Sequence, residues 1–242
     1  AADVVSSNIV GYNKVTLSNE YNLLGSQFVN IGQGVKDINE LMAADNNLPG
    51  LDEDGEFQTT LRIWTGTSYA YYGWLDSDDG TNNEMPEWDS KWLLGDMSGV
   101  ASFDVNDGEG FWVMIPNGQT ATITMSGEVP DDDSIVVDIA RGFNLVANPF
   151  PQTITIQDVK SDDLLGLDND GEFQTTIRVW TGTSYSYYGW LDADDGTNNE
   201  MPEWNSSWLN GDMSGLATQT IDIGKGFWVV SPNAAGHITF TK

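Results

Sequence analysis

The stretch GEFQTTLRIWTGTSYAYYGWL at residues 55–75 decides the fold, because it returns almost unchanged as GEFQTTIRVWTGTSYSYYGWL at residues 171–191. The surrounding segment 51–117 matches 167–233 without a gap, and about three-quarters of the positions are identical, which chance similarity does not produce. We therefore predict two copies of one module within this chain of 242 residues.

The pattern of side chains within each copy indicates strands. Polar and apolar residues alternate over 59–64 and 175–180, as in a half-buried strand. Thr65-Gly66-Thr67 is typical of a hairpin turn, and the β-rich pattern resumes over 69–74. Further short strands are expected at 14–17, 110–114, 121–125 and 134–139, with 110–114 and 121–125 forming a closing pair around a Pro-Asn-Gly turn. Short helices are expected at 37–44 and 86–93.

A polar, acidic and proline-containing stretch, GEVPDDD at 127–133, is typical of a linker. The sequence thus predicts a mostly β protein with two tandem β-sandwich-like modules and short helices. The expected divisions are an N-terminal extension at 1–10, a first module at 11–129 and a second at 130–242.

The charge of the chain is strongly negative, with 37 acidic residues against 9 basic ones and a net charge of -28. Nucleic acid is excluded as a partner, because binding it requires basic groups. No apolar run is long enough to suggest a membrane span. The absence of cysteine and the start at Ala1-Ala2-Asp3 suggest a bacterial protein secreted through a cleaved signal peptide, located outside the cell or on its surface.

Three motifs of the second copy, GFNLVANPFP at 142–151, VWTG at 179–182 and GKGFWV at 224–229, carry a family resemblance. They resemble the GWNLxGNPYP…GxGFWV type of β-sandwich module in bacterial secreted and surface proteins. The first copy keeps Tyr21-Asn22-Leu23 and GEGFWV at 108–113, but Gly25-Ser26-Gln27-Phe28 lacks the Asn-Pro pair. The resemblance implies an extracellular, non-catalytic β domain and does not specify a ligand.

Catalytic residue types are scarce. His237 is the single histidine and cysteine is absent, which argues against a catalytic triad, a cysteine nucleophile or a histidine-rich metal site. Neighbouring carboxylates are expected in so acidic a chain without any catalytic role. The protein is therefore predicted not to be an enzyme.

Two acidic clusters in each copy could supply the hard oxygen ligands that calcium prefers. The candidate ligands are Asp52, Asp54, Asp76, Asp78, Asp79 and Glu84, with their counterparts Asp168, Asp170, Asp192, Asp194, Asp195 and Glu200. Neither cluster has the spacing of an EF-hand. The alternative is a set of solvated acidic turns, since Asp, Asn and Gly favour turns in any case.

Each copy contains five tryptophans. Trp74 and Trp88, with their counterparts Trp190 and Trp204, flank an acidic loop and are candidates for a ligand surface, such as one that holds sugar rings. The alternative is core packing, which we expect for the tryptophans of the two GFWV motifs.

The N-terminal stretch AADVVSSNIV at 1–10 loosely parallels the run from the end of the first module into the second. Its apolar residues Val4, Val5, Ile9 and Val10 could add a strand to the exposed edge of another copy. Such a head-to-tail contact does not close and would build a filament, whereas the alternative is a frayed terminus. The predicted function is a structural homo-oligomer, a filament or surface layer; the alternative is a calcium-assisted adhesin or carbohydrate-binding protein.

Overall fold

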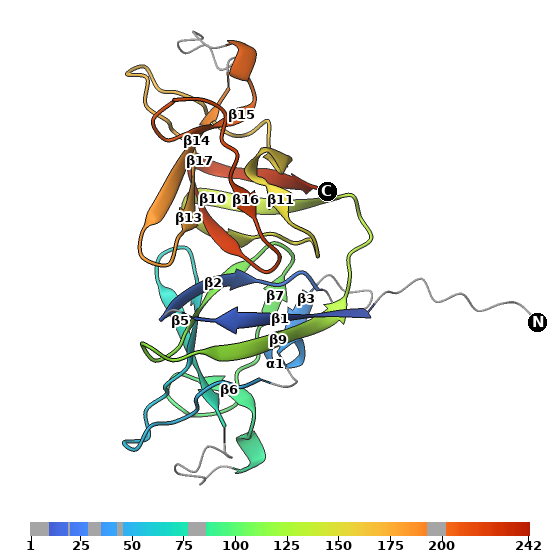
Figure 1. The fold of residues 1–242 in the computed structure, drawn as a ribbon, viewed down its shortest axis with the longest axis vertical. Coiled ribbons are helices and arrows are strands. Elements are labelled where there is room, and N and C mark those ends of the chain that lie inside the picture. Colours follow the sequence, from blue (N-terminus) through green and yellow to red (C-terminus); the bar gives the residue numbers. More distant parts are fainter. Residues whose placement is uncertain (1–9, 19, 29–34, 43–45, 77–85, 193–201) are drawn as a thin grey trace, which may run out of the picture.

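A computed structural model describes residues 10–18, 20–28, 35–42, 46–76, 86–192 and 202–242. The protein is mostly β, as predicted, with short helical segments (Figure 1). The elements up to residue 128 are β1 (Val10–Leu17), β2 (Tyr21–Gly25), β3 (Val35–Asp37), α1 (Ile38–Leu41), β4 (Thr60–Trp64), β5 (Tyr69–Leu75), η1 (Pro86–Trp88), β6 (Lys91–Leu94), β7 (Asp104–Asn106), β8 (Gly110–Met114) and β9 (Ala121–Glu128). Those that follow are β10 (Ser134–Ala147), β11 (Ile154–Thr155), η2 (Ile156–Asp158), β12 (Val159–Lys160), β13 (Thr176–Trp180), β14 (Tyr185–Leu191), η3 (Pro202–Trp204), β15 (Ser207–Asn210), β16 (Thr220–Ile221) and β17 (Gly226–Thr241).

The sheets divide the described chain into two halves that lie one above the other along the long axis (Figure 1). The first half has a five-stranded sheet in the order β2-β8-β4-β5-β6 and the pairs β1–β9 and β3–β7. The second half has a six-stranded sheet, β10-β17-β13-β14-β15 with β12 also paired to β17, and the pair β11–β16. Among the described residues, each of these sheets draws its strands from one half.

Corresponding strands of the two halves pair in the same register. Thr60 lies opposite Gly73 across β4 and β5, and Thr176 lies opposite Gly189 across β13 and β14. One difference is that β10 runs as a single strand where the first half has separate strands β1 and β2. It stays in one sheet through an irregularity between Ala140 and Gly142.

Each half has a hydrophobic core. In the first half, Leu61, Trp92 and Phe111 of the five-stranded sheet pack against Leu17 and Ile123 of the β1–β9 pair. The second half has a separate core built in the same way. The packing places one face of each large sheet inward and leaves the other available for contacts between the halves and with solvent.

Two expectations about local structure were wrong. The predicted helix at 86–93 is only the three-residue η1, because Ser90 adopts a left-handed conformation with φ of 54° and the chain continues as strand β6 beside β5. The predicted pairing of 110–114 with 121–125 does not occur, since β8 pairs with β2 and β4 while β9 pairs with β1. The hairpin at Thr65-Gly66-Thr67 is confirmed.

No helix in the described part of the chain is long and apolar enough to cross a membrane.

Candidate functional site

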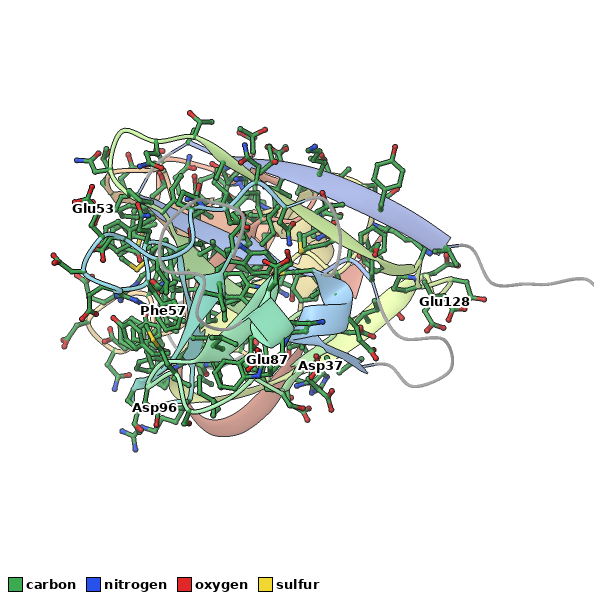
Figure 2. The ribbon with its side chains drawn as sticks, turned by 90° about the horizontal axis from the view of Figure 1, so that it is seen from below. Asp37, Glu53, Phe57, Glu87, Asp96 and Glu128 are labelled. Atoms are coloured by element: carbon green, nitrogen blue, oxygen red, sulfur yellow. The ribbon has the colours of Figure 1, made fainter. Side chains whose placement is uncertain are left out.

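The acidic turn at Asp52 uses its carboxylate to hold its own backbone. Oδ1 of Asp52 accepts hydrogen bonds from the backbone N–H groups of Asp54 at 3.0 Å and Glu56 at 2.9 Å. Asp168 makes the same two bonds in the second half. This geometry explains the turn without a metal ion. Figure 2 shows the neighbouring carboxylate of Glu53 at the periphery of the first half.

The second predicted calcium cluster falls largely on residues that lie outside the described chain, namely Asp78, Asp79, Glu84, Asp194, Asp195 and Glu200. Asp76 and Asp192 are half-buried at the points where the described chain stops. Among the described residues, no group of three or more acidic or histidine side chains converges on a point where an ion could be held. Calcium binding stays a prediction.

The tryptophans beside the acidic loops occupy two environments. Trp74 and Trp190 are each 2% exposed, and their rings pack edge-on against Trp92 and Trp208 at centroid distances of 5.3 and 5.1 Å. They belong to the core, so the expected ligand surface is not available at these two positions.

Trp88 of η1 and Trp204 of η3 are half-buried against small leucine clusters, Leu51, Leu75 and Leu93 in the first half and their counterparts in the second. These two rings therefore keep part of their surface accessible to solvent.

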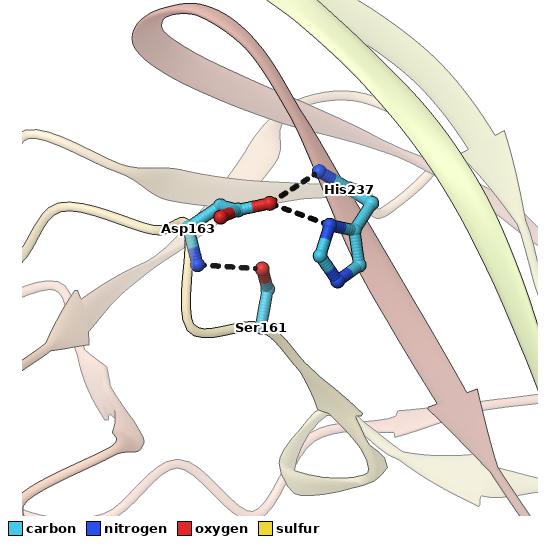
Figure 3. Close-up of polar contacts among 3 residues, drawn as sticks. All are labelled: Ser161, Asp163 and His237. Carbon is cyan, nitrogen blue, oxygen red and sulfur yellow. Dashed lines mark hydrogen bonds and ion pairs between the residues drawn. The ribbon is translucent and has the colours of Figure 1, made fainter.

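The single histidine lies beside a serine and an aspartate (Figure 3). Oδ2 of Asp163 contacts Nδ1 of His237 at 2.5 Å and also accepts the backbone N–H of His237 at 3.1 Å. The hydroxyl of Ser161, however, accepts the backbone N–H of Asp163 at 2.9 Å rather than facing the imidazole. A catalytic triad needs the hydroxyl hydrogen-bonded to the second imidazole nitrogen, and this arrangement instead ties a loop to β17.

The asparagines of the GFNLVANPFP motif are structural. Oδ1 of Asn144 accepts the backbone N–H of Ala140 at 2.7 Å, and its amide donates back to the Ala140 carbonyl at 2.8 Å. Asn148 is fully buried and accepts the backbone N–H of Phe150 at 2.9 Å. In the first half Ser26 replaces Asn148 and its hydroxyl accepts the corresponding N–H of Phe28 at 3.0 Å.

The junction between the halves is built from the GFWV tryptophans, for which core packing was expected, and from two strand tryptophans for which no role was predicted. Trp64 packs edge-on against Trp228 at 5.6 Å, and Trp112 packs in the same way against Trp180 at 5.8 Å. Trp64 and Trp180 are equivalent in the repeat, as are Trp112 and Trp228. The contacts are therefore reciprocal, as in an isologous dimer interface.

Hydrogen bonds follow the same reciprocity. The indole N–H of Trp64 donates to the Phe143 carbonyl at 2.7 Å, and that of Trp180 donates to the Tyr21 carbonyl at 3.2 Å. Tyr21 and Phe143 hold equivalent positions in the two copies of the motif. Because an isologous interface uses the same patch on both partners, it is satisfied by the two halves of one chain.

One surface beside this junction combines exposed aromatic rings with arginines, and we name it the aromatic–arginine face. It comprises Arg62, Trp64, Tyr69, Tyr71, Phe143, Arg178, Tyr185, Tyr187 and Trp228. The Arg62 guanidinium lies 4.4 Å from the centre of the Tyr71 ring, and that of Arg178 lies 4.9 Å from Phe143 and 5.2 Å from Tyr187. A cavity of about 270 Å³ opens between Trp64, Tyr69, Phe143, Arg178, Tyr185 and Trp228.

The charge pattern of the sequence contains a signal for this face. Strands β4, β5, β13 and β14 carry two arginines and no acidic residue in a chain that has 37 acidic residues. Burial also affects the ionisation of one tyrosine on this face. Desolvation raises the pKa of the Tyr69 hydroxyl, and the Trp112 indole that hydrogen-bonds to it partly opposes that rise.

Of the residues predicted to mediate assembly, Val4, Val5 and Ile9 lie outside the described chain. Val10 begins β1 and lies opposite Glu128 of β9, so it belongs to the sheet of the first half. β1 is paired only on the side of β9 in the described structure. The side chains of Val10 and Tyr12 on it are 68% and 78% exposed.

Comparisons of the chain with protein-family models, with curated proteins and with solved structures find no match.

Proposed function

We propose that this chain is a non-enzymatic, extracellular structural protein made of two tandem β-sandwich-like modules, and that copies assemble head-to-tail by strand addition. The observation that carries this proposal is the edge of β1 opposite β9, with which no described strand pairs. An unpaired edge presents a row of backbone N–H and C=O groups, which is a template for a strand from another chain.

The composition of this edge favours pairing. Proteins protect exposed edges with charged residues or prolines, yet the β1 sequence VGYNKVTL contains only Lys14 as a charged residue. In a chain with a net charge of -28, an eight-residue strand without acidic residues avoids the repulsion that two copies otherwise experience. The N-terminal stretch AADVVSSNI at 1–9 has one acid and several β-prone residues, so it is the segment we expect to add to β1 of the next copy.

The junction between the halves also supports growth through the β1 edge, because the junction itself cannot join separate chains into a polymer. Its contacts are reciprocal and therefore close within the chain, so growth of a polymer requires a different surface. The edge of β1 and the N-terminal stretch are unlike one another, and a contact between unlike surfaces is open-ended.

Negative-stain electron microscopy and sedimentation of the purified chain test the proposal. We expect filaments or sheets from the full chain and folded monomers after deletion of residues 1–9. Tyr12→Asp should also yield folded monomers. The substitution places a negative charge at an exposed position on β1, and a charged edge discourages the addition of another strand. Leu216→Asp is the matched control, since Leu216 is 47% exposed but lies outside β1, and it should assemble normally.

Two results would contradict the proposal. If the full chain gives only dispersed monomers with calcium and with a chelator, self-assembly is wrong. If assemblies persist unchanged without residues 1–9, strand addition by that segment is wrong.

A further inference from the structure

The aromatic–arginine face is positively charged in a strongly acidic protein. Seven of its nine residues lie on β4, β5, β13 and β14, whose sequences TLRIW, YAYYGWL, TIRVW and YSYYGWL contain two arginines and no carboxylate. The chain as a whole has a net charge of -28. Acidic residues are therefore absent from these four strands, while Glu109 and Asp138 line the adjoining pocket that shares Trp64 and Phe143 with the face.

The arginines and aromatic rings form cross-strand rows. Arg62 lies opposite Tyr71 on one side and Trp112 on the other, so the row runs ring, guanidinium, ring across β5, β4 and β8. Arg178 lies in the same way between Tyr187 and Trp228 across β14, β13 and β17. Neighbouring strands are about 4.8 Å apart, so each row spans about 10 Å, the length of two sugar rings.

Neither guanidinium has a carboxylate partner within the described residues. The two ion pairs found there involve His237 and Lys242, while the contacts of Arg62 and Arg178 are with aromatic rings. Nε of each arginine is buried and lacks a hydrogen-bond acceptor. Stacking on the rings fixes each guanidinium plane, which prepares its two terminal NH2 groups to bind two oxygen atoms of an anion.

Three of the rings beside these arginines are open to solvent, whereas Trp112 and Trp228 are buried. Tyr71 and Tyr187 are 47% and 50% exposed, and Phe143 is 44% exposed. Aromatic side chains left this accessible next to a cavity offer flat apolar surfaces, and an exposed apolar patch of this kind marks a binding site.

We infer that the aromatic–arginine face binds an anionic pyranose chain, with the carboxylate or sulfate of a sugar on Arg178 and the apolar faces of the rings stacked on Tyr187 and Phe143. Carboxylates and sulfates match the fork of a guanidinium, and sugar C–H groups stack on aromatic faces. The site is distinct from the β1 edge, so the inference does not depend on the proposed assembly.

The overall negative charge does not prevent this binding at physiological salt. The screening length is about 8 Å at an ionic strength of about 0.15 M, so a bound anion interacts mainly with the nearest charges. The charges on its four central strands are Arg62 and Arg178, and Asp138 and Arg141 of β10 have opposite signs and line the adjoining pocket. A short oligosaccharide is the appropriate probe, because it does not extend over the acidic remainder of the surface.

Isothermal titration calorimetry of the full chain tests the inference, with an acidic hexagalacturonate and the neutral galactose hexamer as probes. We expect saturable binding of the acidic sugar and at least about tenfold weaker binding of the neutral one. Arg178→Gln should weaken acidic-sugar binding about tenfold and leave neutral-sugar binding unchanged. Lys160→Gln, at an exposed lysine on β12, also removes one positive charge and should change neither. Tyr187→Ala should weaken both sugars.

Other outcomes would overturn the inference. Equal affinity for acidic and neutral sugars, an equal loss in Lys160→Gln and Arg178→Gln, or no saturable heat at millimolar sugar would each do so. Binding of a single-stranded thymidine oligonucleotide as tightly as the acidic sugar would assign the face to another class of ligand. A sulfated hexasaccharide that binds more tightly than the carboxylated one would support the inference and identify sulfate as the preferred anion.

Discussion

Glycine at position 25 sets how closely the two halves approach. A Cβ atom added to Gly25 would lie 1.9 Å from Cβ of Ala147, and the backbone N–H of Gly25 donates to the Gly224 carbonyl at 3.2 Å. The two backbones therefore meet at a point where no side chain fits. A fixed main-chain contact of this kind cannot relax by rotating a side chain.

Gly25→Ala should therefore destabilise the protein by about 1 to 3 kcal/mol through forced separation of the halves. Thermal unfolding followed by circular dichroism measures the change. Gly99→Ala is the control, since a Cβ there meets no atom within 4 Å, and its midpoint should stay near that of the wild type. Equal midpoints for both variants would show that the close contact is not formed.

Asp107 makes stability depend on pH. Burial, and secondly the charge of Asp132, raises the pKa of Asp107 to about 6. The folded state then holds a proton that the unfolded state releases between about pH 4 and pH 6, so this group contributes stability at low pH that is lost as the pH rises through about 6.

Asp107→Asn should accordingly be more stable than the wild type at pH 7.5 and no more stable at pH 4. The expected gain at pH 7.5 is about 1 to 2 kcal/mol after allowance for solvent screening of this half-buried carboxyl. Urea denaturation at the two pH values measures it. A constant difference between the two proteins across this pH range would refute the assignment.

Residue-level prediction from sequence succeeded for the GFWV tryptophans and failed for Trp74. The β-rich pattern of β5 predicted a strand, but it did not indicate which of its two faces is buried. In the structure Trp74 points into the core, while Tyr69 and Tyr71 are exposed on the opposite face. Proximity to the acidic loop suggested exposure, and only the packing of β5 between β4 and β6 decides which face is buried.

At the scale of elements, helix and strand patterns competed over residues 86–93. A proline at the first turn and tryptophans four residues apart favoured a helix. The chain instead leaves the helix at Ser90, and Trp92 pairs with Trp74 across β6 and β5. Tertiary pairing overrides a short local pattern, because one helical turn gains few hydrogen bonds of its own.

The acidic turn before β4 offers a test of the calcium prediction. Asp52→Ala removes the acceptor for two backbone N–H groups and should destabilise the protein by about 1 kcal/mol, whereas Asp52→Asn keeps a side-chain acceptor and should be nearly neutral. Differential scanning calorimetry with calcium and with a chelator compares the variants. A chelator-induced drop in the wild type that disappears in Asp52→Asn would show that this carboxylate also binds the ion.

For the whole molecule, the side-chain patterns predicted a mostly β chain and the repeat predicted two copies of one module, but neither could predict how the two halves face one another. Two copies in series suggest a head-to-tail stack. Instead, Trp64, Trp112, Trp180 and Trp228 form reciprocal contacts. The ends that carry η1 and η3 therefore point away from each other (Figure 1). This arrangement depends on shape complementarity between surfaces far apart in sequence, which no local pattern records.

The halves should stay together after the connection between them is cut. With a protease site placed between residues 130 and 131, the nicked chain should elute as one species in size-exclusion chromatography at micromolar concentration. The double variant Trp64→Ala and Trp180→Ala, nicked in the same way, should separate into two fragments, because both indole hydrogen bonds are lost. Immediate separation of the nicked wild type would mean that the connection alone holds the halves.

The short connection from Glu128 to Ser134 has a consequence for solution behaviour. A tether of this length keeps one half at an effective concentration on the order of millimolar near the other, whatever the concentration of the chain. Dilution therefore leaves the tryptophan junction intact. Any particle whose size falls in a dilution series must be losing contacts between separate chains, so dilution isolates the intermolecular bond for measurement.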